Sequence, residues 1–331
     1  MHILKYKEVI HACRFCFMCR HLDTVGNVTF QEADTPRSRA LILDRVRMDK
    51  ANLKNPDFID TIYKCALSAS CRHHCVSSYD EAGLVLAARR DIVEAGLVPE
   101  KIKMLAGELE KVEFKVEGQG DFLYYVDPYN KNPEAFVSLA GECKQIKGGD
   151  TGKALEVLGF VEEAKAVFAG FNAAVKAAGC KKIVTSCPAS YDMMKKNLQG
   201  AEVLHSSEHM LAAGFKSACA AKAYYLDSDF LKNYNDNMSA PRELLKSLGF
   251  ELIPFGTNPE ESYAVGEGGV VFDKINPELC ARLCRRVYDL TNDPQKDVLI
   301  TASPYTRSVL QKHQPKLTVL SLEEAVLSAC Q

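Results

Sequence analysis

Residues 181–194 read KKIVTSCPASYDMM, and residues 296–310 read KDVLITASPYTRSVL. Each stretch is a β-type run that ends in small residues and a proline, after which the pattern becomes helical. A second short β-type run follows each of them, and Glu208 and Glu324 stand at matching places beyond it. Strands that alternate with helices at this spacing are typical of parallel βαβ units. The repeat therefore predicts two homologous α/β lobes, each built on a parallel sheet.

Two cysteine-rich segments precede this repeat. The first contains Cys13, Cys16 and Cys19 with the spacing Cys-x-x-Cys-x-x-Cys, and the second contains Cys65, Cys71 and Cys75. In the bacterial two-cluster ferredoxin pattern, three closely spaced thiolates hold one iron–sulfur cluster, and the fourth cysteine of the run ligates the other cluster. The two segments are therefore interpreted together, as a pair of such runs.

Aligned to that pattern, the first run has Asp23 in place of its fourth cysteine, and the second run has Ser68 in place of its second cysteine. The crossing of the fourth ligand then divides the donors into two sets. The first set is Cys13, Cys16, Cys19 and Cys75, and the second set is Asp23, Cys65, Ser68 and Cys71. Both substitutions fall in the second set. The pattern predicts one intact [4Fe–4S] site beside one that is lost or altered, and because Asp and Ser oxygens also ligate iron, a second metal site stays open.

The alternative for these cysteines is a zinc site, since zinc also takes Cys and His ligands and His73 and His74 stand between Cys71 and Cys75. We favour the cluster because three cysteines at this spacing do not readily all ligate one zinc ion. Disulfides are disfavoured, since the opening residues 1–10 lack the apolar core of a secretory signal. In a reducing compartment, 13 cysteines indicate metal or redox chemistry.

The segment between the two cysteine runs carries helix signals. Thr35 precedes Pro36, which is a good N-cap and first helical residue. Ser78 and Glu81 have the spacing of a capping box ahead of an expected helix over residues 82–95. Four arginines follow Pro36, namely Arg37, Arg39, Arg45 and Arg47. We expect them on a solvated helix face, although facing a partner or tuning the potential of a cluster stays open.

Composition excludes several classes of function. Lys+Arg 41 against Asp+Glu 43 leaves a net charge of -2, which gives no electrostatic reason to bind nucleic acid or an acidic membrane. The apolar stretches are interrupted by charges, so no transmembrane segment is expected. We expect a cytoplasmic protein, whether free or peripheral to the inner face of the membrane through a partner.

The ordered set of two cysteine runs and two α/β repeats resembles the iron–sulfur proteins of the heterodisulfide reductase type. That family includes the iron–sulfur subunits of glycolate oxidase and of anaerobic glycerol-3-phosphate dehydrogenase. The resemblance covers nearly the whole chain. It implies an N-terminal ferredoxin domain followed by two cysteine-rich repeats, each with a Cys-Cys-Gly motif and, further on, a Cys-x-x-Cys.

The departures from the family pattern are specific. In place of Cys-Cys-Gly the chain has KGGD at 147–150 and EGG at 267–269, and in place of Cys-x-x-Cys it has CPAS at 187–190 and SPYT at 303–306. Cys187 is the one motif thiol that remains. One thiol cannot hold the noncubane cluster that cleaves disulfides, so heterodisulfide reduction is disfavoured. Cys187 is expected to be a small residue packed beneath a turn.

The expected fold class is α+β overall, with an N-terminal all-α ferredoxin-like domain followed by two homologous α/β lobes. Residues 1–98 are expected to form the helical [4Fe–4S] domain and residues 99–120 a linker. Residues 121–235 and 236–331 are expected to form the first and second degenerate cysteine-rich lobes.

The resemblance implies an electron-transport role, as an oxidoreductase subunit without a substrate site of its own. The expected partner is an FAD-containing dehydrogenase or oxidase of the 2-hydroxy acid or glycerol-phosphate type, with further electron-transfer proteins beyond it. Two alternatives stay open. One is a non-catalytic binding or assembly module with a structural cluster, and the other is a small-molecule site between the two lobes.

Overall fold

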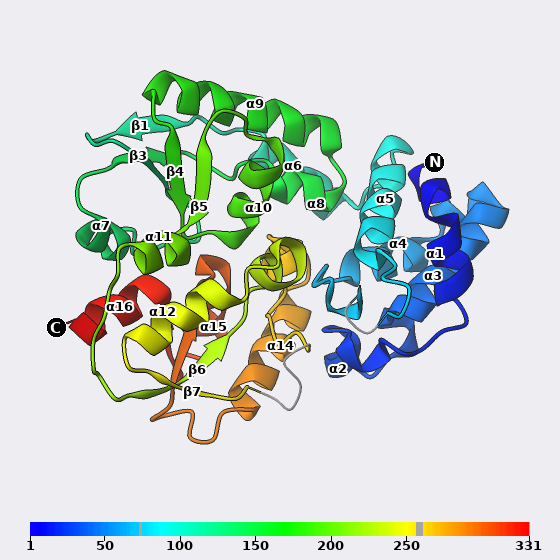
Figure 1. Cartoon of the computed structure of the whole chain (residues 1–331). Helices are drawn as coiled ribbons and strands as arrows, with labels where there is room; N and C mark the ends of the chain where they lie inside the picture. Colours follow the sequence, from blue (N-terminus) through cyan, green and yellow to red (C-terminus); the bar gives the residue numbers. More distant parts are fainter. Residues whose placement is uncertain (73–74, 256–260, 331) are drawn as a thin grey trace.

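The structure is a computed structural model that describes residues 1–72, 75–255 and 261–330. Its N-terminal part is helical, and two sheets follow along the chain. Figure 1 shows the helical part, coloured blue to cyan, beside the regions that contain the first sheet (green) and the second sheet (yellow to red). The prediction of a mixed fold with parallel sheets is confirmed.

Short helices joined by turns make up the N-terminal part. The α-helices are α1 (Lys7–Cys13), α2 (Gly26–Thr29), α3 (Pro36–Met48), α4 (Pro56–Lys64), α5 (Glu81–Glu94) and α6 (Glu100–Leu109). The 3-10 turns among them are η1 (His2–Tyr6), η2 (Arg20–Leu22), η3 (Glu32–Asp34), η4 (Lys50–Lys54) and η5 (Ser70–Arg72). Helix α3 begins as predicted, because the Thr35 side chain accepts a hydrogen bond from Ser38 N–H and Pro36 is the first helical residue.

The predicted capping box before α5 is wrong. The helix begins at Glu81, and its N-cap is Asp80, whose side chain accepts a hydrogen bond from Gly83 N–H. Ser78 lies outside the helix with φ at 49°, a left-handed conformation. Asp is as good an N-cap as Ser, and it stands directly before the first helical residue.

The first sheet has five strands in the order β1-β3-β2-β4-β5. They are β1 (Lys115–Glu117), β2 (Leu123–Tyr125), β3 (Lys144–Lys147), β4 (Lys182–Thr185) and β5 (Glu202–His205). All pairs are parallel except β1 with β3. The helices of this region are α7 (Glu134–Ala140), α8 (Lys153–Leu158), α9 (Val161–Ala178), α10 (Pro188–Asn197) and α11 (Ser206–Ala212). Residues 99–120, expected as a linker, contain α6 and β1.

The second sheet has four parallel strands in the order β7-β6-β8-β9. They are β6 (Lys222–Leu226), β7 (Glu251–Ile253), β8 (Val298–Thr301) and β9 (Thr318–Ser321). Its helices are α12 (Ser239–Ser247), α13 (Phe272–Ile275), α14 (Pro277–Asp289), α15 (Pro304–His313) and α16 (Leu322–Cys330). A π-helical turn, η6 (Phe230–Tyr234), and a 3-10 turn, η7 (Glu267–Gly269), complete the region.

The two sheets repeat one strand order, because β3-β2-β4-β5 corresponds to β7-β6-β8-β9. The matched glutamates have the same local role. Glu208 Oε2 accepts from His205 N–H at 2.7 Å, and Glu324 Oε2 accepts from Ser321 N–H at 3.0 Å. A further part of the repeat was missed, since YYVD at 124–127 recurs as YYLD at 224–227 and covers the ends of β2 and β6.

Two hydrophobic cores hold these parts together. One contains Ile10 of α1 together with Ile183 of β4 and Leu299 of β8, so it joins the helical part to both sheets. The other contains Val184 of β4 and Ile300 of β8 and lies between the two sheets. Among the described residues, no helix combines the length and the apolar character needed to cross a bilayer.

Candidate functional site

The first set of cysteines lines one pocket in the helical part. Cys13 ends α1, Cys16 and Cys19 lie in the turns that follow it, and Cys75 lies in the turn before α5. A pocket of about 190 Å³ is bordered by all four of these residues. Its other lining residues are Ala12, Met18, Pro36, Arg37, Val76, Ser77 and Tyr79. The structure therefore brings together the four residues that the crossing pattern assigned to one cluster.

Backbone hydrogen bonds hold these cysteines in place. Cys16 N–H donates to the carbonyl of Cys13 at 3.1 Å, which makes the first cysteine turn tight. Tyr79 N–H donates to Cys75 Sγ at 3.4 Å. Hydrogen bonds to ligand sulfurs are among the means by which a protein sets the potential of an iron–sulfur cluster.

The four thiols lie close enough to affect one another's ionisation. The pKa of the Cys13 thiol is raised to about 12, first by burial and then by the negative charges of Glu81 and the other three thiolates. The pKa of Cys19 is also raised to about 12, chiefly by burial and next by Glu81, while Arg39 opposes the rise. Metals bind the thiolate, so iron entering this pocket would displace protons and offset the charge that the thiolates concentrate there.

The arrangement of the cysteine sulfurs differs from that of a zinc site, because no three of them in the described ranges lie within 4.8 Å of one another. Zn–S bonds of about 2.3 Å in a tetrahedron place the sulfurs about 3.8 Å from one another. Within the described ranges, three potential ligand atoms lie within 4.8 Å of one another in one group, which consists of His2, Asp91 and Glu94. No such group in these ranges includes a cysteine. His73 and His74, which the zinc alternative would use, lie outside the described residues. As they lie, the described cysteines therefore do not form a compact zinc site.

The second set surrounds a buried guanidinium. Arg39 is 1% exposed. Its Nη2 lies 2.5 Å from Asp23 Oδ2, and its Nε lies 2.6 Å from Glu81 Oε1. Its Nη1 donates to the carbonyl of Asp34 at 2.7 Å. A buried cation with two carboxylate partners thus lines the same cavity as the second set.

The expected solvated position of Arg39 is wrong, although Arg45 of the same helix is exposed as expected. Arg39 shares a helical face with Leu43 and Val46, both of which are fully buried. The apolar stripe of α3 therefore carries Arg39 into the core, where the two carboxylates compensate its charge.

Little space remains inside the second set. The cavity among its residues has a volume of about 10 Å³, roughly the space that one water molecule needs. Cys71 Sγ donates to Glu81 Oε2 at 3.5 Å, and the hydroxyl oxygens of Ser68 and Ser70 lie 2.9 Å apart. The pKa of Cys65 is raised to about 11, chiefly by burial. As the residues lie, the second set does not fit a [4Fe–4S] cluster.

The loop that carries Cys65 is held by residues from distant parts of the chain. Arg89 is fully buried and donates to the Cys65 carbonyl and to a carbonyl of α8, both at 2.7 Å. Tyr234 Oη donates to the Leu67 carbonyl at 2.7 Å. A Cβ on Gly268 would lie 2.1 Å from that same carbonyl oxygen. Gly268, which stands where the family has Cys-Cys-Gly, is explained by this close approach.

The corresponding part of the first sheet region is also closely packed. Cys187 lies between β4 and α10 and is 6% exposed. Burial, and next the charge of Asp127, raises the pKa of its thiol well above the usual value. A Cβ on Gly148 would lie 2.0 Å from the carbonyl oxygen of Glu113. This arrangement fits the interpretation of Cys187 as a packed residue.

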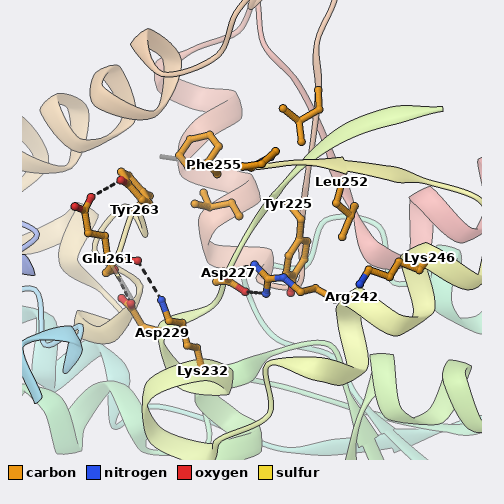
Figure 2. Close-up of a pocket in the computed structure, with 14 residues that line it drawn as sticks. Tyr225, Asp227, Asp229, Lys232, Arg242, Lys246, Leu252, Phe255, Glu261 and Tyr263 are labelled. Carbon is orange, nitrogen blue, oxygen red and sulfur yellow. Dashed lines mark hydrogen bonds and ion pairs between the residues drawn. The ribbon is translucent and has the colours of Figure 1, made fainter. Parts of the chain in front are cut away.

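A separate cavity of about 360 Å³ lies beyond the ends of β6 and β7 (Figure 2). Arg242 Nη2 pairs with Asp227 Oδ2 at 2.7 Å, and the guanidinium lies 5.0 Å from the Tyr225 ring centroid. Burial raises the pKa of Asp229 well above its usual range, and the Ser262 hydroxyl donates to it at 2.7 Å. The described lining residues all belong to the second sheet region. This cavity is therefore not the site between two lobes that the sequence left open.

No family model matches the chain, and no curated protein matches it in sequence. Among solved structures, a protein from Helicobacter pylori described as hypothetical is similar, with a TM-score of 0.61 and 10% identity over 99% of this chain and 76% of that chain. This likeness shows a shared fold.

Two racemases are less similar. Aspartate racemase from Picrophilus torridus has a TM-score of 0.34 and 12% identity over 64% of this chain and 95% of that chain. Glutamate racemase RacE1 from Bacillus anthracis has a TM-score of 0.32 and 14% identity over 63% of this chain and 80% of that chain. Scores this low carry no argument about this chain.

Proposed function

We propose that this chain is an iron–sulfur electron-transfer protein with one [4Fe–4S] cluster on the first set of cysteines. The observation that carries the proposal is that the four thiols, from two distant segments, line one pocket of about 190 Å³. Such a cluster, when bound, accepts and donates single electrons. The second set is proposed to hold no cluster, because Arg39 fills the space among its donors.

Residues of this chain would adjust the electrostatics around that cluster. The Tyr79 N–H that donates to Cys75 Sγ stabilises negative charge on the sulfur. The positive charge of Arg39 acts on the neighbouring Cys19 thiol in the same sense. Cys16 is exposed, so the cysteine pocket lies at the protein surface, where an electron can be exchanged with another protein.

The finer description of the fold belongs to the same proposal. We infer that the helical part is a ferredoxin-type domain and that the two sheet regions are homologous lobes that have lost their cysteine ligands. The shared strand order of the two sheets supports the second inference. By resemblance, the partner is an FAD-containing dehydrogenase or oxidase in the cytoplasm, whose two-electron flavin needs a one-electron outlet.

This function is tested by electron flow through the complex. With an FAD-containing 2-hydroxy acid dehydrogenase as partner, Cys16→Ser should abolish transfer to an external acceptor while substrate still reduces the flavin. The Cys330→Ser variant, which changes an exposed cysteine far along the chain, is the matched control and should transfer normally. Full-rate onward transfer without this protein would overturn the proposal and favour the assembly module.

A second candidate function, small-molecule binding on the second sheet, is favoured by the cavity in Figure 2. A ligand bound there would raise the melting temperature of the protein, and the rise would grow with the logarithm of the ligand concentration above its dissociation constant. Arg242→Ala should remove that rise, since Arg242 is a charged lining residue. A rise that persists in Arg242→Ala would place the ligand elsewhere.

A further inference from the structure

Large apolar side chains are exposed beside the cysteine pocket. Those that line the thiol pocket or the groove next to it are Phe17 at 63%, Met18 at 58%, Phe30 at 82% and Val76 at 99%. We refer to these four residues as the apolar face. Gathered exposed apolar side chains of this size mark interaction sites more often than single ones do.

The apolar face is continuous with the thiol pocket. Met18 borders both that pocket and a neighbouring groove of about 550 Å³, which Phe17 and Phe30 also line. Val76 borders the thiol pocket from the second cysteine segment. A molecule that covers these side chains would therefore also cover Cys16, the exposed cysteine of the first set.

The backbone at Phe30 caps helix α2, because its N–H donates to the carbonyl of Gly26 at 2.9 Å. Phe30 follows α2 with φ at 57°, in the left-handed region that bulky residues rarely adopt. Such conformations cost free energy and persist where the surrounding structure imposes them. Here the conformation accompanies a ring that is 82% exposed.

The charged side chains that line the thiol pocket and the neighbouring groove are Arg20 and Arg37, and the exposed carboxylate of Asp80 lies four residues after Val76. Among residues 11–39, Asp23 and Asp34 are buried, so the exposed carboxylate is that of Glu32. Glu32 pairs with the exposed Arg20 at 3.2 Å. Arg37 borders the thiol pocket, and its Nε has no hydrogen-bond partner among the described residues. A complementary surface would have an apolar centre and an acidic rim.

We propose that the apolar face docks the redox partner of this protein and that this partner has an acidic rim around its cofactor. The inference rests on the proposed function. Apolar contact excludes water at the centre of an interface, and complementary charges at the rim orient the partner and speed its association. One electron then passes between the reduced cofactor of the partner and the cluster, and no bond forms or breaks.

The test uses reduced flavodoxin, an acidic flavin protein, as the one-electron donor, and follows reduction of the loaded protein by stopped flow. Phe30→Ser and Val76→Ser should each lower the second-order rate constant by about fivefold or more. Met104→Ser, which changes a 62% exposed methionine on α6, is the matched control and should not. Charge reversal of Arg20 and Arg37 should slow transfer at low salt, and the effect should shrink as salt rises.

Iron content and the visible spectrum of each variant separate the two proposals. Variants that keep the wild-type iron content but reduce at the wild-type rate would overturn the docking surface and leave the proposed function standing. Wild-type protein without iron would overturn both. If the wild type forms a dimer in sedimentation experiments and Phe30→Ser abolishes that dimer, the apolar face binds a second copy of the chain. This result would overturn the proposal that a redox partner docks there.

Discussion

The first and second sets of predicted ligands lie close together, but the space among their donor atoms differs in size. The first set borders a pocket of about 190 Å³, whereas the cavity that the second set lines together with Arg39 has a volume of about 10 Å³. Both sets combine donors from the two cysteine segments. The difference shows that two similar cysteine runs can be packed differently, one set around a pocket and the other beside a buried ion pair.

Under the proposed function, the ion pair stands where the resembled family would hold a second cluster, and this has a physical reason. Removal of a cluster leaves a void, and voids in a packed interior are costly. Arg39 fills that volume with a side chain, and Asp23 and Glu81 compensate its charge at 2.5 and 2.6 Å. Because Glu81 begins α5, the pair also joins α3 to the helix that follows Cys75.

The largest expected effect is the gain of a second cluster. The double variant Asp23→Cys, Ser68→Cys restores four thiols, but Arg39 still occupies the space among them. We expect about four iron per chain in this variant and about eight when Arg39→Ala is added, since each cubane holds four. Iron analysis after anaerobic reconstitution checks this, and eight iron in the double variant would show that Arg39 does not block the site.

The next effect concerns the ion pair itself. Arg39→Ala leaves Asp23 and Glu81 buried without their cation, and breaking a buried pair in this way costs roughly 3–5 kcal/mol in the free energy of unfolding. Arg45→Ala, on the exposed side of the same helix, should change it by no more than about 0.5 kcal/mol. Urea unfolding measures both. Equal stabilities of the two variants would mean that the buried Arg39 ion pairs do not stabilise the fold.

A smaller effect concerns the pH dependence of stability. Glu81 is buried beside the positive charge of Arg39, whereas Glu267 is a buried acid whose hydrogen-bond donors are neutral. Glu267 accepts hydrogen bonds from the Ser228 hydroxyl at 2.9 Å and from Asp229 N–H at 2.6 Å, and burial raises its pKa to about 7. A carboxyl group whose folded pKa is raised stabilises the fold at low pH and loses that contribution as pH rises through 7.

Between about pH 4.5 and pH 8, Glu267 should therefore lower the free energy of unfolding by roughly 1–3 kcal/mol. The Glu267→Gln variant should lack this part of the pH dependence, because its side chain does not ionise. Unfolding measured across the pH range checks the slope. An identical slope in the wild type and the variant would contradict the assignment.

Local signals made much of the fold predictable. The Thr35–Pro36 start and the repeated strand-turn-helix units follow from short-range rules, and the structure contains both. The cysteine spacing also predicted that Cys75 joins the first set. Cys75 borders that pocket, and Cys71 lies in the second set.

The centre of the second set was harder to predict, because its decisive residue is an arginine. Charge suggested a solvated position for Arg39, and its two partners lie 16 and 42 residues away in sequence. Its place on the stripe of Leu43 and Val46 was the available signal. The close approach of Gly268 to the Leu67 carbonyl is a tertiary contact that no local pattern reveals.

The central claim is that the first set alone holds a cluster, with Cys75 as its fourth ligand. Iron and sulfide analysis of anaerobically purified wild type, Cys75→Ser and Cys71→Ser tests it most directly. We predict about four iron and four sulfide per chain in the wild type and in Cys71→Ser, and loss of both in Cys75→Ser. Iron retained in Cys75→Ser but lost in Cys71→Ser, or a wild-type value near eight, would contradict the claim.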